Sequence, residues 1–268
     1  MKTRAITGIF FVAAMLASVL LGAYVFSVFL LFLSLFCLDE FYRLVRTDTI
    51  KPLRTPGIIL GLGIFIPIGS YFLKGDEWTC LLIAVPLAVL VFLTELYRKS
   101  EAPFHNIAYT FLGVFFAVIP FSFFHALGFI EGVYNFHFPL GFLLMLWAHD
   151  TGAYLFGIKF GKNRLFERHS PKKSWEGLFG GMATTLLVSW ILSNYYTELP
   201  AIHWAVISLI IAVFGTYGDL VESMLKRSMD KKDSGALLPG HGGLLDRFDG
   251  LLLSAPLVFV YLYLVLMA

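Results

Sequence analysis

Charged residues are scarce in this 268-residue chain: Asp, Glu, Lys and Arg make up 14% of it, while 58% is hydrophobic and the mean hydropathy is +0.79. Soluble domains carry about 25% charged residues, so this composition excludes an ordinary soluble fold and indicates that lipid surrounds most of the chain. Cysteine is also rare, and Cys37 and Cys80 lie in apolar segments at different predicted depths. The sequence therefore argues against a disulfide framework.

The local motifs of several enzyme classes are missing as well. The chain has no Walker-type loop, Rossmann fingerprint, zinc-ligand spacing or nucleophile elbow, which argues against a P-loop ATPase or a covalent hydrolase. No cleavable signal is expected, because the first apolar run continues to about residue 38 without a small-residue cleavage site. Without an internal repeat or a low-complexity linker, residues 1–268 are interpreted as a single transmembrane domain.

Long apolar runs, separated by Gly, Pro or charged residues, predict the membrane helices. A hydrocarbon core about 30 Å thick needs about 20 helical residues. About nine segments qualify, at residues 5–22, 24–45, 57–73, 78–97, 105–130, 138–158, 176–194, 201–226 and 251–267. No charge marks the first break, near Gly22, and a single kinked helix there would reverse the orientation of everything downstream. The prediction is an all-α polytopic membrane protein.

The distribution of Lys and Arg predicts the orientation. With nine spans and a cytoplasmic N-terminus, only Lys74 of the 20 Lys and Arg residues lies outside. Such an asymmetry is typical of membrane proteins, whose cytoplasmic loops are enriched in positive charge, and it puts the C-terminus on the outer side. The two longest polar segments, about residues 159–175 and 227–250, then both face the cytoplasm.

Carboxylates inside predicted spans are the first candidates for function, because each costs at least about 2.5–3.5 kcal/mol in hydrocarbon. Asp150 lies in the sixth span, and Asp219 and Glu222 lie near the cytoplasmic end of the eighth. At about 100° per residue, Asp219, Glu222 and Lys226 share one helical stripe. A salt bridge that only stabilises the bundle is an equal alternative for this helix. His149, beside Asp150, is interpreted as a packing residue.

The second long polar segment has the composition of a phosphate and metal site. Gly240, Gly242 and Gly243 allow the backbone to approach a ligand closely. Asp246 and Asp249 follow at the predicted start of the last span. Carboxylates without nearby cysteine suit Mg²⁺, a hard cation that commonly bridges protein to substrate phosphates. This segment therefore predicts a polyphosphate site.

The first long polar segment supplies matching cations. Ser170 and Pro171 are helix-start signals just before the seventh predicted span, and Lys172, Lys173 and Ser174 follow. Free N–H groups at a helix start, the helix dipole and two lysines together favour an anion site. Anchoring on anionic lipid headgroups is at least an equal alternative for the other cations of this segment. These are Lys159, Lys162, Arg164 and Arg168.

A pattern containing Lys-Arg, Lys-Asp, His-Gly-Gly and Asp-Arg-apolar-Asp spans residues 223–249. Its positions are Ser223, Leu225, Lys226, Arg227, Lys232, Asp233, Gly235, Leu238, Pro239, His241, Gly242, Gly243, Leu244, Asp246, Arg247, Phe248 and Asp249. This stretch resembles the signature of the phosphatidate cytidylyltransferases, also called CDP-diacylglycerol synthases. Weaker similarity extends upstream, with Trp175 in place of a smaller apolar residue. Residues 141–268 therefore resemble the catalytic part of that family, while residues 1–140 are similar only in hydropathy and topology and are interpreted as a membrane scaffold.

The resemblance implies transfer of CMP from CTP to the phosphate of phosphatidate, with release of pyrophosphate. It also implies a divalent metal at Asp219 and Asp246. We expect Mg²⁺ there, with Asp150 and Asp249 in or near the shell, and a second, monovalent cation stays open. Lys226 and His241 complete the predicted catalytic set, His241 contacting phosphate or leaving pyrophosphate. The alternative for His241 is a loop residue without a role.

The predicted substrate-binding residues share a positive charge, a hydroxyl group or a glycine backbone. They are Ser170, Lys172, Lys173, Ser174, Arg227, Lys232, Gly242, Gly243 and Arg247. The predicted partners are CTP, phosphatidate and the membrane, without nucleic acid. A homodimer is compatible with the sequence, although no motif specifies it. The predicted location is the plasma membrane of a bacterium, with the active site facing the cytoplasm.

Two other functions stay open from the sequence. A CTP-dependent polyprenol or phytol kinase has similar acidic and basic loops, but the long signature match disfavours it. A secondary transporter would use Asp150, Asp219 and Glu222 to carry ions or protons. Transporters usually show repeated halves and broken helices, and neither is evident here.

Overall fold

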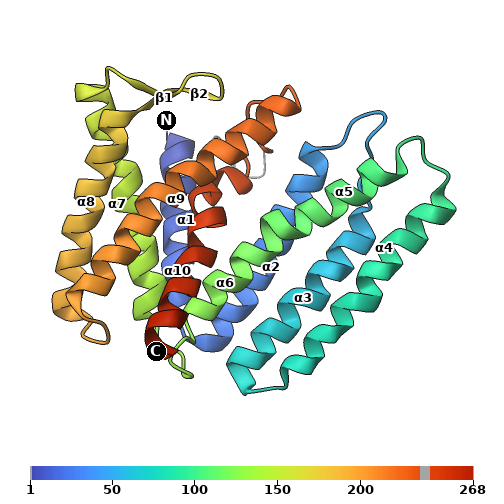
Figure 1. The fold of residues 1–268 in the computed structure, drawn as a ribbon, viewed down its shortest axis with the longest axis horizontal. Coiled ribbons are helices and arrows are strands. Elements are labelled where there is room, and N and C mark those ends of the chain that lie inside the picture. Colours follow the sequence, from blue (N-terminus) through green and yellow to red (C-terminus); the bar gives the residue numbers. More distant parts are fainter. Residues whose placement is uncertain (1, 236–241, 268) are drawn as a thin grey trace. The chain divides into compact units, whose positions relative to one another are not determined.

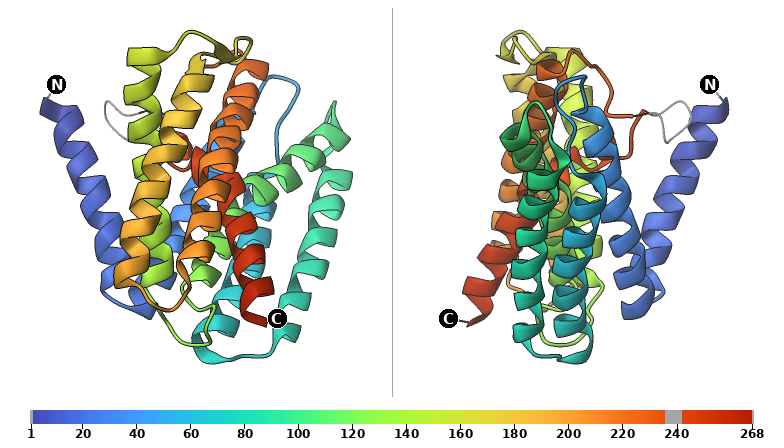
Figure 2. Two further views of the ribbon diagram at one scale, coloured as in Figure 1. Left: turned by 60° about the vertical axis from the view of Figure 1, so that its left-hand side comes forward. Right: turned by 90° about the vertical axis from the view of Figure 1, so that its right-hand side faces the viewer.

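The computed structural model describes residues 2–235 and 242–267, and it divides the chain into two compact units. Unit 1 is formed by Met1–Tyr134 and Asp233–Arg247, and unit 2 by Asn135–Lys232 and Phe248–Ala268. Both units are built mainly from helices (Figures 1 and 2). The segment 233–247, which carries much of the signature, thus belongs to the same unit as the N-terminal half of the chain.

Unit 1 is a bundle of helices whose bounds agree with the predicted apolar segments to within a few residues. Its elements are α1 (Lys2–Leu20), α2 (Ala23–Leu44), α3 (Arg54–Lys74), η1 (Trp78–Ile83), α4 (Ala84–Arg98), α5 (Pro103–Gly113), η2 (Val114–Val118), α6 (Ile119–Leu127) and η3 (Leu245–Arg247). The π-helical segment η2 joins α5 to α6 without a break, so these three elements occupy one predicted span. The predicted break near Gly22 is present between α1 and α2.

The core of unit 1 is filled by large apolar side chains from α2 and α6. Phe26, Phe121 and Phe124 are fully buried. A hydrogen bond joins two helices within this core: the hydroxyl of Tyr42 in α2 donates to the carbonyl oxygen of Thr110 in α5 at 2.8 Å. Buried polar groups without partners are costly, and lipid offers none, so such pairing is what a membrane environment demands.

Unit 2 consists, within the described residues, of four long helices and a β-ribbon. Its elements are α7 (His137–Phe160), β1 (Arg164–Phe166), β2 (Ser170–Ser174), α8 (Trp175–Tyr195), α9 (Ala201–Ser228) and α10 (Asp249–Met267). α8 packs against α7 and α9, and α9 packs against α10 (Figures 1 and 2). β1 and β2 pair in antiparallel fashion and lie at the end of this unit where α9 finishes.

The β-ribbon is a feature that the sequence did not predict. The fold agrees with the predicted all-α class, and the predicted loop 159–175 contains a short ribbon of two strands. Ser170 and Pro171 lie in β2, where the backbone is extended, and α8 begins only at Trp175. The start of α8 agrees to within one residue with the predicted span of residues 176–194, and Ser174 rather than Ser170 is its N-cap.

Seven helices among the described residues are long and apolar enough to cross a membrane by their length and composition. They are α2, α3, Trp78–Arg98, Pro103–Leu127, α8, α9 and Asp249–Leu266. The apolar part of α1, Thr7–Leu20, is shorter. These helices support a polytopic membrane protein, while the total number of spans stays a prediction.

Candidate active site

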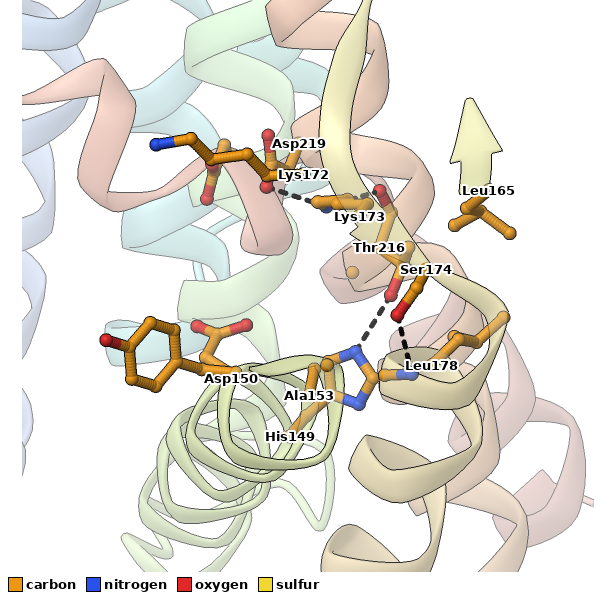
Figure 3. A pocket seen from close by; sticks show the side chains of 15 residues that line it. His149, Asp150, Ala153, Leu165, Lys172, Lys173, Ser174, Leu178, Thr216 and Asp219 are labelled. Atoms are coloured by element: carbon orange, nitrogen blue, oxygen red, sulfur yellow. Dashed lines mark hydrogen bonds and ion pairs between the residues drawn. The ribbon is translucent and has the colours of Figure 1, made fainter. Parts of the chain in front are cut away.

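Unit 2 contains a cavity of about 310 Å³, a size within the range of about 300–1,000 Å³ typical of small-molecule sites (Figure 3). The polar side chains that line it come from four elements. They are His149, Asp150 and Tyr154 of α7, Lys172, Lys173 and Ser174 of β2, Thr216 and Asp219 of α9, and Asp249 of α10. The fold therefore brings acids and lysines that are far apart in the sequence to one hollow.

Close packing of α9 on the start of α10 brings two of these acids together. A Cβ atom on Gly218 would lie 2.3 Å from the carbonyl oxygen of Asp249, so only glycine permits this approach. Asp219 is the next residue, and it forms a cluster with Asp249 and Glu222 in which one oxygen of each carboxylate lies within 4.8 Å of the others. A cluster of carboxylates alone suits a hard divalent cation.

Two lysines balance the negative charge of this carboxylate cluster. The amine of Lys173 lies 2.6 Å from the carboxylate of Asp219 and donates to the carbonyl oxygen of Thr216 at 3.2 Å (Figure 3). The amine of Lys226 lies 2.9 Å from the carboxylate of Glu222, which is fully buried. The Glu222–Lys226 pair is thus the internal salt bridge that the sequence left as an alternative. Lys173 and Asp219 instead line the cavity.

The β-ribbon is fixed to α8 by two side chains. Ser174 is the N-cap of α8, and its hydroxyl oxygen accepts a hydrogen bond from the N–H of Gly177 at 3.1 Å. The carboxylate of Glu176 accepts from the N–H of Lys162 at 3.1 Å, at the start of the ribbon. Because Lys173 directly precedes this cap, its backbone is held in place at the cavity.

The two adjacent lysines of β2 differ in their environment. Lys173 is half-buried and pairs with Asp219, whereas Lys172 is exposed. Figure 3 shows the amine of Lys172 pointing away from that of Lys173. Alternation of side chains along an extended strand explains this difference. Lys172 thus remains at the cavity lining without the same link to Asp219.

α7 contributes a buried histidine and an exposed aspartate to the cavity. Nε2 of the buried His149 is hydrogen-bonded to the hydroxyl of Thr216 at 2.8 Å, in agreement with the packing role expected for it. Asp150 is exposed and lines the cavity (Figure 3). Sequence reasoning missed Thr216, because a lone threonine in an apolar helix is usually a packing residue and gives no signal of its own.

The remaining predicted residues lie at other places. Arg227 is exposed and donates to the carbonyl oxygen of Lys231 at 3.2 Å, and Lys232 is also exposed. Ser170 pairs with Phe166 in the ribbon. His241 lies outside the described residues. The predicted residues that belong to unit 1 are Gly242, Gly243, Asp246 and Arg247.

Asp246 is the second residue predicted as a principal metal ligand. Its Oδ2 atom accepts hydrogen bonds from the N–H groups of Gly243 at 2.9 Å and Ser234 at 3.1 Å. These bonds orient the carboxylate within unit 1. Its role as a metal ligand stays a prediction.

Comparison with known proteins identifies the family. A sequence model of the cytidylyltransferase family matches residues 2–265. The chain belongs to the cytidylyltransferase family. This cytidylyltransferase is therefore a nucleotidyltransferase, and the resemblance drawn from residues 223–249 is confirmed. The similarity also covers residues 2–140, for which the sequence alone indicated only shared hydropathy.

Several similar proteins carry the name phosphatidate cytidylyltransferase. The protein from Staphylococcus aureus strain COL is 34% identical to this cytidylyltransferase over 267 residues, covering 98% of this chain and 99% of the relative. Those from Staphylococcus haemolyticus strain JCSC1435 and Staphylococcus epidermidis strain ATCC 12228 are 33% and 34% identical over the same shares. The similarity thus extends over the full length of these relatives.

Proposed function

We propose that this enzyme transfers the cytidylyl group of CTP to phosphatidate, giving CDP-diacylglycerol and pyrophosphate. The observation that carries the proposal is the cavity of unit 2, where the carboxylates of Asp150, Asp219 and Asp249 lie together with the amine of Lys173. The shared name of the relatives supplies the substrate class. A lipid substrate also agrees with a protein built from long apolar helices.

The reaction needs neutralisation of the negative charge on the two phosphate substrates more than it needs a general base. The phosphate of phosphatidate is the nucleophile, and it is already largely dianionic near neutral pH. One of its oxygens forms a bond to the α-phosphorus of CTP, while the bond from that phosphorus to the bridging oxygen breaks and its electron pair leaves with pyrophosphate. Because two polyanions must meet, the barrier is mainly electrostatic.

Lys173 is the cation best placed to lower this barrier. Its contacts with Asp219 and the carbonyl of Thr216 hold its amine at the cavity before substrate arrives, so little reorganisation is needed. Further positive charge is predicted from the signature and the ribbon. The residues concerned are Lys172, Lys226, Arg227, Lys232 and Arg247.

We assign the carboxylate cluster to Mg²⁺. Asp219 and Asp249 would hold the ion, with Asp150 close by, while buried Glu222 pairs with a lysine of its own helix. When bound, such an ion neutralises and orients the phosphates of the nucleotide. Asp246 stays a predicted ligand from the signature, and a monovalent cation beside Mg²⁺ stays open.

The proposed topology follows the charge distribution. It has nine spans, a cytoplasmic N-terminus and an outer C-terminus, so that the positive-inside asymmetry is satisfied. The active site then faces the cytoplasm, where CTP is available. The seven apolar helices and the bacterial source of the relatives support a plasma-membrane location.

The decisive experiment uses the detergent-purified chain with CTP, phosphatidate and Mg²⁺. We expect pyrophosphate and CDP-diacylglycerol in equal amounts. A polyprenol or phytol kinase would instead release CDP and a phosphorylated alcohol when given the alcohol. Uptake of a solute into sealed vesicles without nucleotide turnover would favour a transporter. Absence of both proposed products under these conditions refutes the assignment.

A further inference from the structure

Glu40, near the C-terminal end of α2, is a buried carboxylate for which the sequence analysis assigned no role. The residue is 6% exposed. Its Oε1 accepts hydrogen bonds from the hydroxyl of Ser234 and from the N–H of Leu245 at 2.9 Å. Its Oε2 accepts from the N–H of Leu244 at 2.8 Å. All three donors belong to unit 1 and stand 194 to 205 positions further along the chain.

The carboxylate of Glu40 also explains two glycines of the signature. A Cβ atom on Gly243 would lie 2.1 Å from Oε1 of Glu40 and 1.9 Å from the hydroxyl oxygen of Ser234. A Cβ atom on Gly235 would lie 2.8 Å from Oε2 of Glu40. Side chains at these positions would displace the carboxylate, so the glycines permit the contact. The two described ends of the signature segment, residues 233–235 and 242–247, therefore fit closely around one side chain of α2.

The same segment ends in the carboxylate of Asp246, and Glu40 is linked to it through shared residues. Ser234 donates its hydroxyl to Glu40 and its N–H to Asp246. Gly243 donates its N–H to Asp246, and a Cβ atom at this position would collide with Glu40. A shift of these residues would change the direction of the Asp246 carboxylate. The two acids thus accept hydrogen bonds from the same short stretches of backbone.

We infer that Glu40 is a positioning residue of this enzyme: it holds the described ends of the signature segment so that Asp246 is correctly oriented for the reaction. Hydrogen bonds from a hydroxyl and two N–H groups to one carboxylate are charge-assisted and directional. Without the carboxylate of Glu40, the N–H groups and the hydroxyl that donate to it lose their buried acceptor. This loss favours another arrangement of the backbone. The effect on catalysis rests on the proposed function, whereas the effect on the segment does not.

Glu95 in α4 provides a matched control within unit 1. It is 2% exposed and accepts hydrogen bonds from the amide of Asn106 at 2.6 Å and from the hydroxyl of Ser100. The guanidinium of Arg98 also donates to it at 3.4 Å, and the three partners stand 3 to 11 positions away, so its contacts are local. Substitution of Glu95 thus removes a buried carboxylate of the same kind without touching the signature segment.

The test compares Glu40→Gln with Glu95→Gln by hydrogen exchange and by kinetics. In Glu40→Gln we expect the amides of Leu244 and Leu245 to exchange at least about tenfold faster, with the rest of the chain unchanged. We expect kcat to fall about tenfold or more with little change in KM for CTP, because the reacting geometry rather than nucleotide binding is altered. Glu95→Gln should keep both properties within about twofold of the unmodified protein.

Ser234→Ala and Glu40→Asp provide further tests that do not remove the whole contact. Ser234→Ala deletes one of the three donors and should give a smaller loss of kcat, and the double variant with Glu40→Gln should be no worse than Glu40→Gln alone. Glu40→Asp keeps the charge and should recover part of the loss. Normal exchange at Leu244 and Leu245 in Glu40→Gln would overturn the inference.

Other outcomes separate this inference from the proposed function. Equal losses of kcat in Glu40→Gln and Glu95→Gln, with faster exchange throughout the chain, would show that Glu40 acts on stability alone and would overturn its positioning role. If the unmodified protein makes no CDP-diacylglycerol, the proposed function fails. The exchange experiment then still decides whether Glu40 holds the segment.

Discussion

The two units differ in how they use acids within apolar helices. In unit 1, buried Glu40 accepts hydrogen bonds from two backbone N–H groups and a hydroxyl. Buried Glu95 accepts from an amide and a hydroxyl and also pairs with the guanidinium of Arg98 at 3.4 Å. In unit 2, Asp150 and Asp219 face a cavity, and Asp219 is paired with the amine of Lys173. A buried acid whose oxygens accept from donors of the protein fixes the segments that carry those donors, whereas an acid beside a cavity is open to exchange with the substrate under the proposed function. The surroundings of an acid, more than its presence in an apolar helix, therefore indicate its role.

The largest loss of activity should come from substitution of Asp219, the acid of unit 2 that pairs with Lys173 at the cavity. Asp219→Asn keeps the shape of the side chain but removes its charge, so we expect kcat/KM to fall about 10²–10³-fold, measured by pyrophosphate release. The control is Asp39→Asn in unit 1, where the aspartate pairs with Arg43 and Arg54. Similar activity in both variants would break the comparison between the units.

The next effect concerns the packing that brings two acids together. Gly218→Ala would push a methyl group against the carbonyl oxygen of Asp249, so we expect a loss of about 1–3 kcal/mol in stability and reduced activity. Thermal unfolding in detergent measures the stability. Gly69→Ala in α3 is the control, because its nearest neighbouring atoms would be 3.8 Å away. If both substitutions are tolerated alike, close packing of α9 on α10 is not what shapes the cluster.

A smaller effect should distinguish the two lysines of β2. Lys173→Ala removes the cation paired with Asp219 and should lower kcat/KM about tenfold, which corresponds to about 1.4 kcal/mol. Lys172→Ala should lower kcat/KM less, because the amine of Lys172 is exposed and points away from that of Lys173. Steady-state kinetics with varied CTP measures both. The reverse order of effects would show that the exposed lysine, not the paired one, meets the substrate.

The smallest loss of activity is expected from substitution of an exposed residue of the ribbon. Arg164 in β1 is exposed, and an exposed cation of a membrane protein commonly rests on lipid headgroups. Arg164→Ala should therefore keep kcat/KM within about twofold in an assay with detergent-dispersed phosphatidate. A loss as large as that of Lys173→Ala would extend the anion site to the whole ribbon.

Much of this protein can be predicted from its sequence, for reasons of local chemistry. The helix bounds follow from apolar runs, because a chain in lipid must satisfy its backbone hydrogen bonds internally. Asp150, Asp219 and Glu222 stand out because ionised groups are costly in apolar segments. The pattern over residues 223–249 is dense enough to identify the family, and the match to residues 2–265 agrees with it.

The tertiary structure alone decided which polar groups meet. The stripe of Asp219, Glu222 and Lys226 allowed either acid to pair with the lysine, and packing assigned Glu222 to Lys226 and Asp219 to Lys173 of the ribbon. Glu40, like Asp150, is a carboxylate within a predicted membrane span, yet its hydrogen-bond partners lie some two hundred positions away in the chain. Local patterns carry no record of such contacts, because these depend on how closely distant backbones approach one another.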